Sequence, residues 1–179
     1  MRGQIVSAEC ELGVPLYRQN MHKAVRYPHG EDKAIDYVFG LLDIPWWYYA
    51  IAALIGAVVW KTWRWESGLL AGYAFLILAE TVLIRKPFEG SHFQPEIFWS
   101  WRAWKVQKNQ ILTNVVMFIP VGVLAGRLWK WKGLLVAAGL SGLIEVLQVL
   151  TARGLMELDD VMHNMVGAVV GAGLVILFR

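Results

Sequence analysis

The sequence predicts an all-α integral membrane protein, a bundle of about five transmembrane helices. One reason is composition, since 57% of the 179 residues are apolar and only 17% are charged, against about 45–50% and about 25% in soluble domains. A soluble domain of this size could not bury that much apolar surface. The same numbers exclude a disordered chain, and the single Cys excludes an intramolecular disulfide framework and a multi-Cys zinc site.

The second reason is the distribution of charge, because five stretches are nearly free of charged residues. They are residues 44–60, 67–84, 111–129, 133–150 and 161–178. Each is about as long as a bilayer crossing, and the apolar runs are continuous rather than alternating, which favours helices over barrel strands. The ten Trp residues gather near the ends of these stretches, as in the aromatic belts at headgroup level. A helical bundle buried in water is the weaker alternative, because the chain lacks a polar shell.

Two polar regions lie outside the predicted helices. Residues 1–43 form a polar N-terminal segment without the apolar core of a signal peptide, and we expect it at the membrane interface. The sequence leaves both Met1 and Met21 open as the first residue. The loop at 85–110 mixes Trp and Phe with Lys and Arg, which predicts an interfacial amphipathic segment. We expect no nucleic-acid partner, because lipid headgroups explain both the aromatic and the basic half of this loop.

The positions of Lys and Arg predict the orientation in the bacterial plasma membrane. The short loop after the first stretch carries Lys61 and Arg64, and the loop after the third carries Arg127, Lys130 and Lys132 without an acid. The positive-inside rule therefore places these loops in the cytoplasm, and the N-terminal segment and the 151–160 loop outside. The long 85–110 loop is also basic, but long segments follow the rule less strictly.

The polar residues inside the predicted helices share one end of the bundle. They are Glu80, Asn114, Glu145, Gln148 and Asn164, and the alternating direction of the helices places all of them at the outer leaflet. The deepest lies about 8 Å below the interface. Ser141 shares a helix face with Glu145 and Gln148, and Asp160 shares another with Asn164. We therefore expect a polar pocket that opens to the outer face.

Each of these residues also has a purely structural interpretation. Asn114, Gln148 and Asn164 could each be an interhelical hydrogen bond worth about 0.6 kcal/mol. Glu145 is the hardest to explain in this way, because an acid inside a membrane helix costs roughly 2.5–3.5 kcal/mol. It needs a partner or must stay protonated, and Arg85 and Arg153 are the cations available on its side.

We expect neither a metal nor a cofactor. Asp160 and His163 have helical spacing and could share a metal, but no further ligand has helical spacing with that pair. His163 is therefore expected to be an interfacial residue without a binding role.

Three motifs are similar to those of the VanZ-like membrane protein family. The segment from Asn114 to Gly122, NVVMFIPVG, resembles the family's N-x-x-x-F-x-P-x-G. A second motif of the family, E-x-x-Q … R … D-x-x-x-N-x-x-G-A-x-x-G, resembles Glu145-x-x-Gln148, Arg153, Asp160-x-x-x-Asn164 and Gly167-Ala-x-x-Gly171. Thr81-x-x-x-Arg85 is similar to the T-x-x-x-R at the end of the family's preceding helix. The resemblance covers roughly residues 75–175. It implies a VanZ-like transmembrane domain at 67–179, with 44–66 as an additional first helix and loop.

The resemblance implies a membrane protein that lowers susceptibility to teicoplanin-type glycopeptide and lipoglycopeptide antibiotics. The implied partners are membrane lipids, lipid-linked cell-wall precursors or the antibiotics themselves, and the oligomeric state stays open. The candidate ligand-binding residues are Arg85, Asn114, Glu145, Gln148, Arg153, Asp160 and Asn164. The alternative is an enzyme acting on a lipid-linked substrate, with Glu145 or Asp160 as acid or base. A small transporter is a weaker third hypothesis, because no internal repeat is visible.

Overall fold

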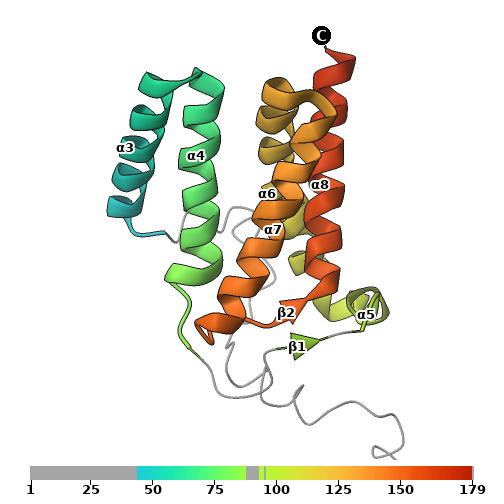
Figure 1. Ribbon diagram of the computed structural model, residues 1–179. Coiled ribbons are helices and arrows are strands. Elements are labelled where there is room, and N and C mark those ends of the chain that lie inside the picture. Colours follow the sequence, from blue (N-terminus) through green and yellow to red (C-terminus); the bar gives the residue numbers. More distant parts are fainter. Residues whose placement is uncertain (1–43, 88–92, 95, 179) are drawn as a thin grey trace, which may run out of the picture.

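The computed structural model describes residues 44–87, 93–94 and 96–178 (Figure 1). The predicted polar segment 1–43 and residues 88–92 of the predicted interfacial loop lie outside the described residues. The described part is a bundle of helices. Its long helices are α3 (Trp46–Thr62), α4 (Trp65–Leu78), α6 (Trp104–Trp129), α7 (Gly133–Leu150) and α8 (Leu158–Leu177).

Short elements connect these helices. The π-helix η2 (Ala79–Leu83) continues α4, and the 3₁₀ turn η3 (Lys130–Lys132) joins α6 to α7. The one-turn helix α5 (Trp99–Arg102) precedes α6. The two-residue strands β1 (Phe93–Gln94) and β2 (Met156–Glu157) pair in parallel, with Gln94 opposite Glu157. This pairing ties the connection before α5 to the connection before α8.

The helical prediction is confirmed, and the predicted membrane crossings are confirmed in part. All five apolar stretches are helical. Among the described residues, three helical segments are long and apolar enough to cross a membrane, namely Trp65–Leu83, Gln107–Leu150 and Leu158–Leu177. The second of these passes through the η3 turn and so contains both α6 and α7. A bundle of five crossings stays a prediction.

The closest helix packing joins α6 and α8, and glycine permits it. A Cβ atom on Gly122 would lie 2.1 Å from the carbonyl oxygen of Ala168, and one on Gly167 would lie 2.0 Å from that of Val115. No side chain fits at such distances, so only glycine lets the two backbones meet. The apolar core beside this contact centres on Phe118, which is fully buried.

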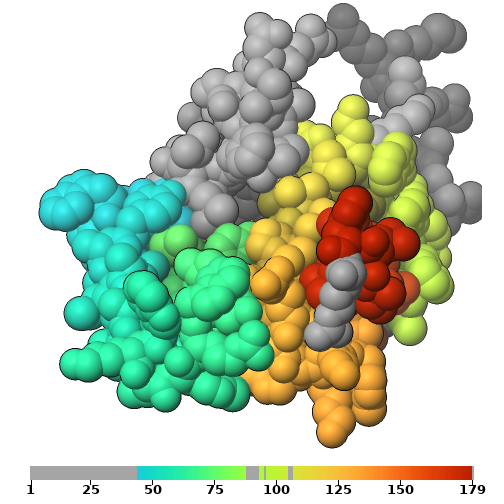
Figure 2. Space-filling model, turned by 90° about the horizontal axis from the view of Figure 1, so that it is seen from above, coloured from blue at the N-terminus to red at the C-terminus, as the bar shows by residue number. Residues whose placement is uncertain are grey.

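The bundle has two chemically different ends (Figure 1). The α3–α4 turn, the α6–α7 turn and the end of α8 lie at one end, and α5, β1 and β2 lie at the other. Figure 2 looks onto the first end, with α3 and α4 in blue and green, α7 in orange and α8 in red. We call these the basic end and the strand end, because the basic turns occupy the first and both strands the second.

Candidate functional site

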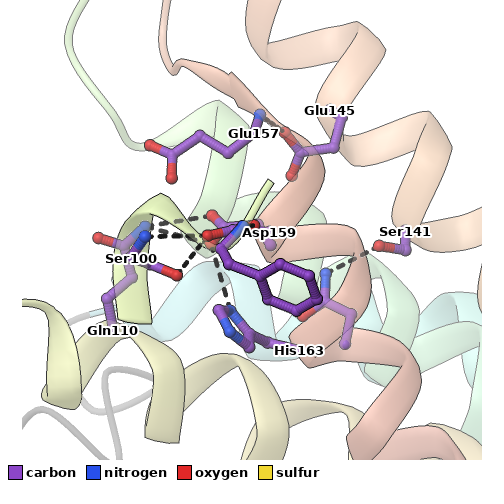
Figure 3. A network of polar contacts seen from close by, with 10 residues as sticks. Ser100, Gln110, Ser141, Glu145, Glu157, Asp159 and His163 are labelled. Atoms are coloured by element: carbon purple, nitrogen blue, oxygen red, sulfur yellow. Dashed lines mark hydrogen bonds and ion pairs between the residues drawn. The ribbon is translucent and has the colours of Figure 1, made fainter. Parts of the chain in front are cut away.

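Buried and half-buried polar side chains gather at the strand end, where α7, β2 and α8 meet (Figure 3). We call this set the polar cluster. Its members are Ser100, Gln110, Ser141, Glu145, Gln148, Glu157, Asp159, Asp160, His163 and Asn164. Buried polar groups are costly unless they are hydrogen-bonded, so the partners of each one indicate its role.

Asp159 holds the loop that contains α5. Its carboxylate accepts hydrogen bonds from the backbone N–H of Phe98 (2.6 Å), the backbone N–H of Ser100 (2.9 Å) and the Ser100 hydroxyl (2.5 Å). Asp159 is 1% exposed. Phe98 has a φ angle of 63°, a left-handed conformation that costs a non-glycine residue about 1 kcal/mol or more. Asp159 therefore stabilises a strained turn, and its role is structural.

Glu145 reaches the other strand-end loop. Its Oε2 accepts a hydrogen bond of 2.8 Å from the backbone N–H of Glu157, the residue just before α8. Both carboxyl groups are buried, at 2% and 3% exposed. The β1–β2 pairing brings Gln94 to the same residue. Glu157 is thus fixed from α7 and from β1.

The pKa of Glu157 is raised to about 9, first because burial disfavours its charged form. The nearby carboxylates of Asp160 and Glu145 act in the same direction, and the Trp99 indole opposes it. At neutral pH Glu157 is therefore a protonated acid. It brings a hydroxyl donor into a cluster that otherwise consists mainly of acceptors.

Asp160 is the most accessible acid of the cluster, and the buried His163 lies beside it. The Asp160 side chain is 15% exposed, and it accepts a hydrogen bond of 3.1 Å from Gln110 Nε2. His163 Nδ1 lies 3.9 Å from Asp160 Oδ1. His163 is only 2% exposed, and its ring centroid lies 6.0 Å from that of Trp101. α8 thus turns the His163 imidazole into the protein, and its position at the membrane interface stays a prediction.

Two buried side-chain amides link the helices through their N–H groups, while the oxygen of each amide has no hydrogen-bond donor among the described residues. Asn164 Nδ2 donates to Ser141 Oγ at 2.9 Å, and Gln148 Nε2 donates to the Thr81 carbonyl at 3.3 Å. Within the described part of the chain, Asn164 Oδ1 and Gln148 Oε1 are buried without a hydrogen-bond partner. Both ring nitrogens of His163 also lack one. These atoms retain hydrogen-bonding capacity that a ligand could use.

The two arginines predicted to bind an anion occupy different environments. Arg153 Nη1 donates to the Leu83 carbonyl at 2.8 Å, at the end of η2. It is positioned by the end of α7, where Ala152 is left-handed and the Arg153 N–H bonds to the Gln148 carbonyl. Arg85 is exposed just beyond η2 and within electrostatic range of Glu145. Arg153 thus helps to hold the backbone, and Arg85 is exposed at the edge of the cluster.

Of the predicted ligand-binding residues, Glu145 and Asp160 lie within electrostatic range of each other, and Asn164 on α8 bonds to Ser141 on α7. Gln148 is buried on α7 and bonds to the Thr81 carbonyl. Asn114 lies on α6, and its Nδ2 atom is buried without a hydrogen-bond partner among the described residues. Glu145, Glu157 and Asp159 of the cluster are closed off from solvent at 3% exposed or less. The predicted opening to the outer face therefore stays a prediction.

Sequence reasoning missed Ser100, Gln110, Glu157 and Asp159 as members of the cluster. The signal for Asp159 was the acidic pair in the first turn of α8, from which spacing selects only Asp160. Ser100 lies in the one-turn helix α5 and Glu157 in the two-residue strand β2, and elements this short have no period that indicates which side chains turn inward.

The described residues contain no group of three or more His, Cys, Asp or Glu side chains that could hold a metal ion. What the cluster offers is hydrogen bonding. It combines unpartnered amide oxygens, an imidazole and several carboxyl groups. Such a set is suited to groups that carry O–H and N–H donors, such as sugar hydroxyls, amides and amines.

The comparisons with known proteins give one family. The family model described as VanZ/LLP1 matches residues 46–179, which includes α3 and every later element. The searches of curated proteins and of solved structures found no match.

Proposed function

Since the chain belongs to the VanZ/LLP1 family, which links it to glycopeptide resistance, we propose that it lowers susceptibility to teicoplanin-type antibiotics. In this proposal the polar cluster recognises a lipid headgroup, a lipid-linked cell-wall precursor or the antibiotic. The protein resides in the plasma membrane with the strand end outward. All three ligands occur at the headgroup level of that leaflet.

The observation that supports this proposal is the surplus of hydrogen-bonding atoms in a buried place. Asn164 Oδ1 and Gln148 Oε1 are acceptors without donors, on side chains that are 3% and 4% exposed. An unpaired buried acceptor costs about 1–3 kcal/mol. A ligand that supplies hydroxyl or amide donors would recover this energy, so the cost is consistent with a binding site.

The charges of the cluster favour a particular part of the ligand. Acids outnumber cations, which favours hydroxyl, amide and ammonium groups of a sugar or peptide over a bare phosphate. Arg85 at the edge could then receive an adjacent phosphate or carboxylate. Opening of the α5 loop or of the strand pair is the step that would admit such a group.

The test is antibiotic protection by Glu145→Gln in a susceptible bacterial host. Glutamine keeps an oxygen that can accept the Glu157 N–H, so the fold is expected to persist while the ionisable carboxyl group is lost. Glu96→Gln is the matched control, because Glu96 is an exposed acid paired with Arg102 at the surface. The readout is the inhibitory concentration of teicoplanin at equal membrane abundance of each variant. Loss of protection in Glu145→Gln alone supports the proposal, and full protection contradicts it.

An enzyme acting on a lipid-linked substrate is the second candidate. Glu157 is a neutral acid beside Asp160, and two acids in different environments can divide acid and base roles. Asp160 also faces His163, a group that commonly transfers protons. This hypothesis expects Asp160→Asn and Glu145→Gln to bind a lipid-linked precursor as well as wild type without converting it. Absence of any product from wild type would contradict it.

A further inference from the structure

A second charged site lies at the basic end, away from the polar cluster. It is a cleft of about 350 Å³ between the start of α4 and the ends of α6 and α8. One wall is charged and formed by Arg64, Glu66 and Arg127. The other wall is apolar and formed by Val123, Leu174, Val175 and Phe178.

Glu66 organises the charged wall. Its side chain is 2% exposed, and Arg64 binds it with two nitrogens, at 2.8 Å and 3.3 Å. Arg127 Nε lies 3.8 Å from the same carboxylate, and the Arg127 guanidinium lies over the Trp65 ring at 5.5 Å. One carboxylate thus orients two guanidinium groups. The wall keeps a net positive charge because the two arginines outnumber the acid.

The two guanidinium groups remain accessible to another anion. The side chains of Arg64 and Arg127 are 53% and 50% exposed, although each contacts Glu66. A guanidinium has five N–H donors, more than one shared carboxylate can occupy. Preoriented guanidinium pairs bind phosphate oxygens well, because planar donor sets match the geometry of phosphate.

The apolar wall indicates what the anion is attached to. Leu174 and Phe178 belong to a strongly exposed apolar end of α8, where Leu177 is 78% and Phe178 is 86% exposed. Exposed apolar surface of this kind suits acyl chains. Lys130 and Lys132 lie in the adjacent η3 turn, and Figure 2 shows this end of the bundle. Basic residues at a membrane surface attract anionic lipids.

We infer that this cleft binds an anionic phospholipid, with the phosphate on Arg64 and Arg127 and an acyl chain along the apolar wall. Glu66 is then a positioning residue that presents the arginines. The site is independent of the polar cluster and of its proposed ligand. An anion without an acyl chain would leave the apolar wall unused, so the structure favours a lipid over a free phosphate.

The test measures lipid retention by the purified full chain in nanodiscs of phosphatidylcholine with added phosphatidylglycerol, read by native mass spectrometry. Arg127→Gln is the informative variant, because Arg64 still neutralises Glu66 and the fold should persist. The expected loss of phosphatidylglycerol is at least about tenfold, as removal of a charge-assisted hydrogen bond implies. Lys132→Gln is the matched control, since it removes the same charge from the same end but does not line the cleft.

Three outcomes decide the inference. Selective loss in Arg127→Gln, with partial retention in Arg127→Lys, supports it. Equal loss in Arg127→Gln and Lys132→Gln overturns it, because the effect would then be general surface charge. Displacement of the lipid by millimolar inorganic phosphate overturns the lipid assignment and leaves a soluble phosphate as the occupant. Monodisperse elution and an unchanged melting temperature establish that each variant is folded.

Discussion

Replacement of Asp159 by alanine is expected to release the α5 loop without unfolding the bundle. The change removes the acceptor of three hydrogen bonds, two from Ser100 and one from Phe98. Ser100 is 3% exposed, so its two donors would be left unpaired in a place that water does not reach. Each stranded donor costs about 1–3 kcal/mol, which gives about 2–6 kcal/mol for the pair.

The loop can avoid part of this cost by opening, which also relieves the left-handed conformation of Phe98. The local free energy of opening is therefore expected to fall by about 3 kcal/mol. This corresponds to amide hydrogen exchange that is about a hundredfold faster in the α5 loop. Hydrogen-exchange mass spectrometry on the protein in detergent measures this directly, with α8 as an internal reference.

Asp160→Ala is the matched control for this experiment. Asp160 is the neighbouring acid, but its side chain is 15% exposed and it accepts hydrogen bonds from the Gln110 side chain rather than from the α5 backbone. It is expected to change exchange of the α5 loop by less than about fivefold, as a loss below about 1 kcal/mol implies. The reasoning is refuted if Asp159→Ala exchanges at the wild-type rate, or if both variants accelerate the loop equally.

Two further predictions concern stability. Glu157 has a pKa of about 9 in the folded chain against an ordinary value of 4.5, so the folded state binds the extra proton between these values. The free energy of unfolding should fall as pH rises across that window, by at most about 1.4 kcal/mol per pH unit. Glu157→Gln should flatten this dependence in melts followed by Trp fluorescence, and an unchanged slope would contradict the burial argument. Gly167→Ala should destabilise the bundle by at least about 2 kcal/mol, because its Cβ meets a backbone oxygen. Gly173→Ala has open space around it and should be neutral or stabilising, and a similar loss in both would reject the close-contact explanation.

The helices could be predicted from the sequence because the apolar stretches are long and lack charge. The predicted 133–150 stretch coincides with α7, and the others differ only at their ends. The largest difference is α6, which begins at Trp104 rather than near residue 111. Its first turns are polar, so hydropathy alone places the start too late.

The helix-borne part of the polar cluster could also be predicted, because helical spacing puts Glu145 and Gln148 on one face of α7 and Asp160 and Asn164 on one face of α8. The loop-borne part could not. The parallel β1–β2 pairing joins segments more than sixty residues apart, and two-residue strands leave no periodic pattern. The role of Asp159 follows from another long-range contact, its hydrogen bonds with Ser100. The spacing of residues along α8 does not predict this contact.

The glycine contact between α6 and α8 has a consequence for motion. Two backbones that meet without intervening side chains cannot slide or tilt without a steric clash, so these helices form the stationary frame of the protein. Any movement that exposes the acids of the strand end must therefore come from α7, from α5 or from the paired strands. During such a movement, spin labels on α6 and α8 should keep a constant separation, while the distance from a label on α7 to either helix should change.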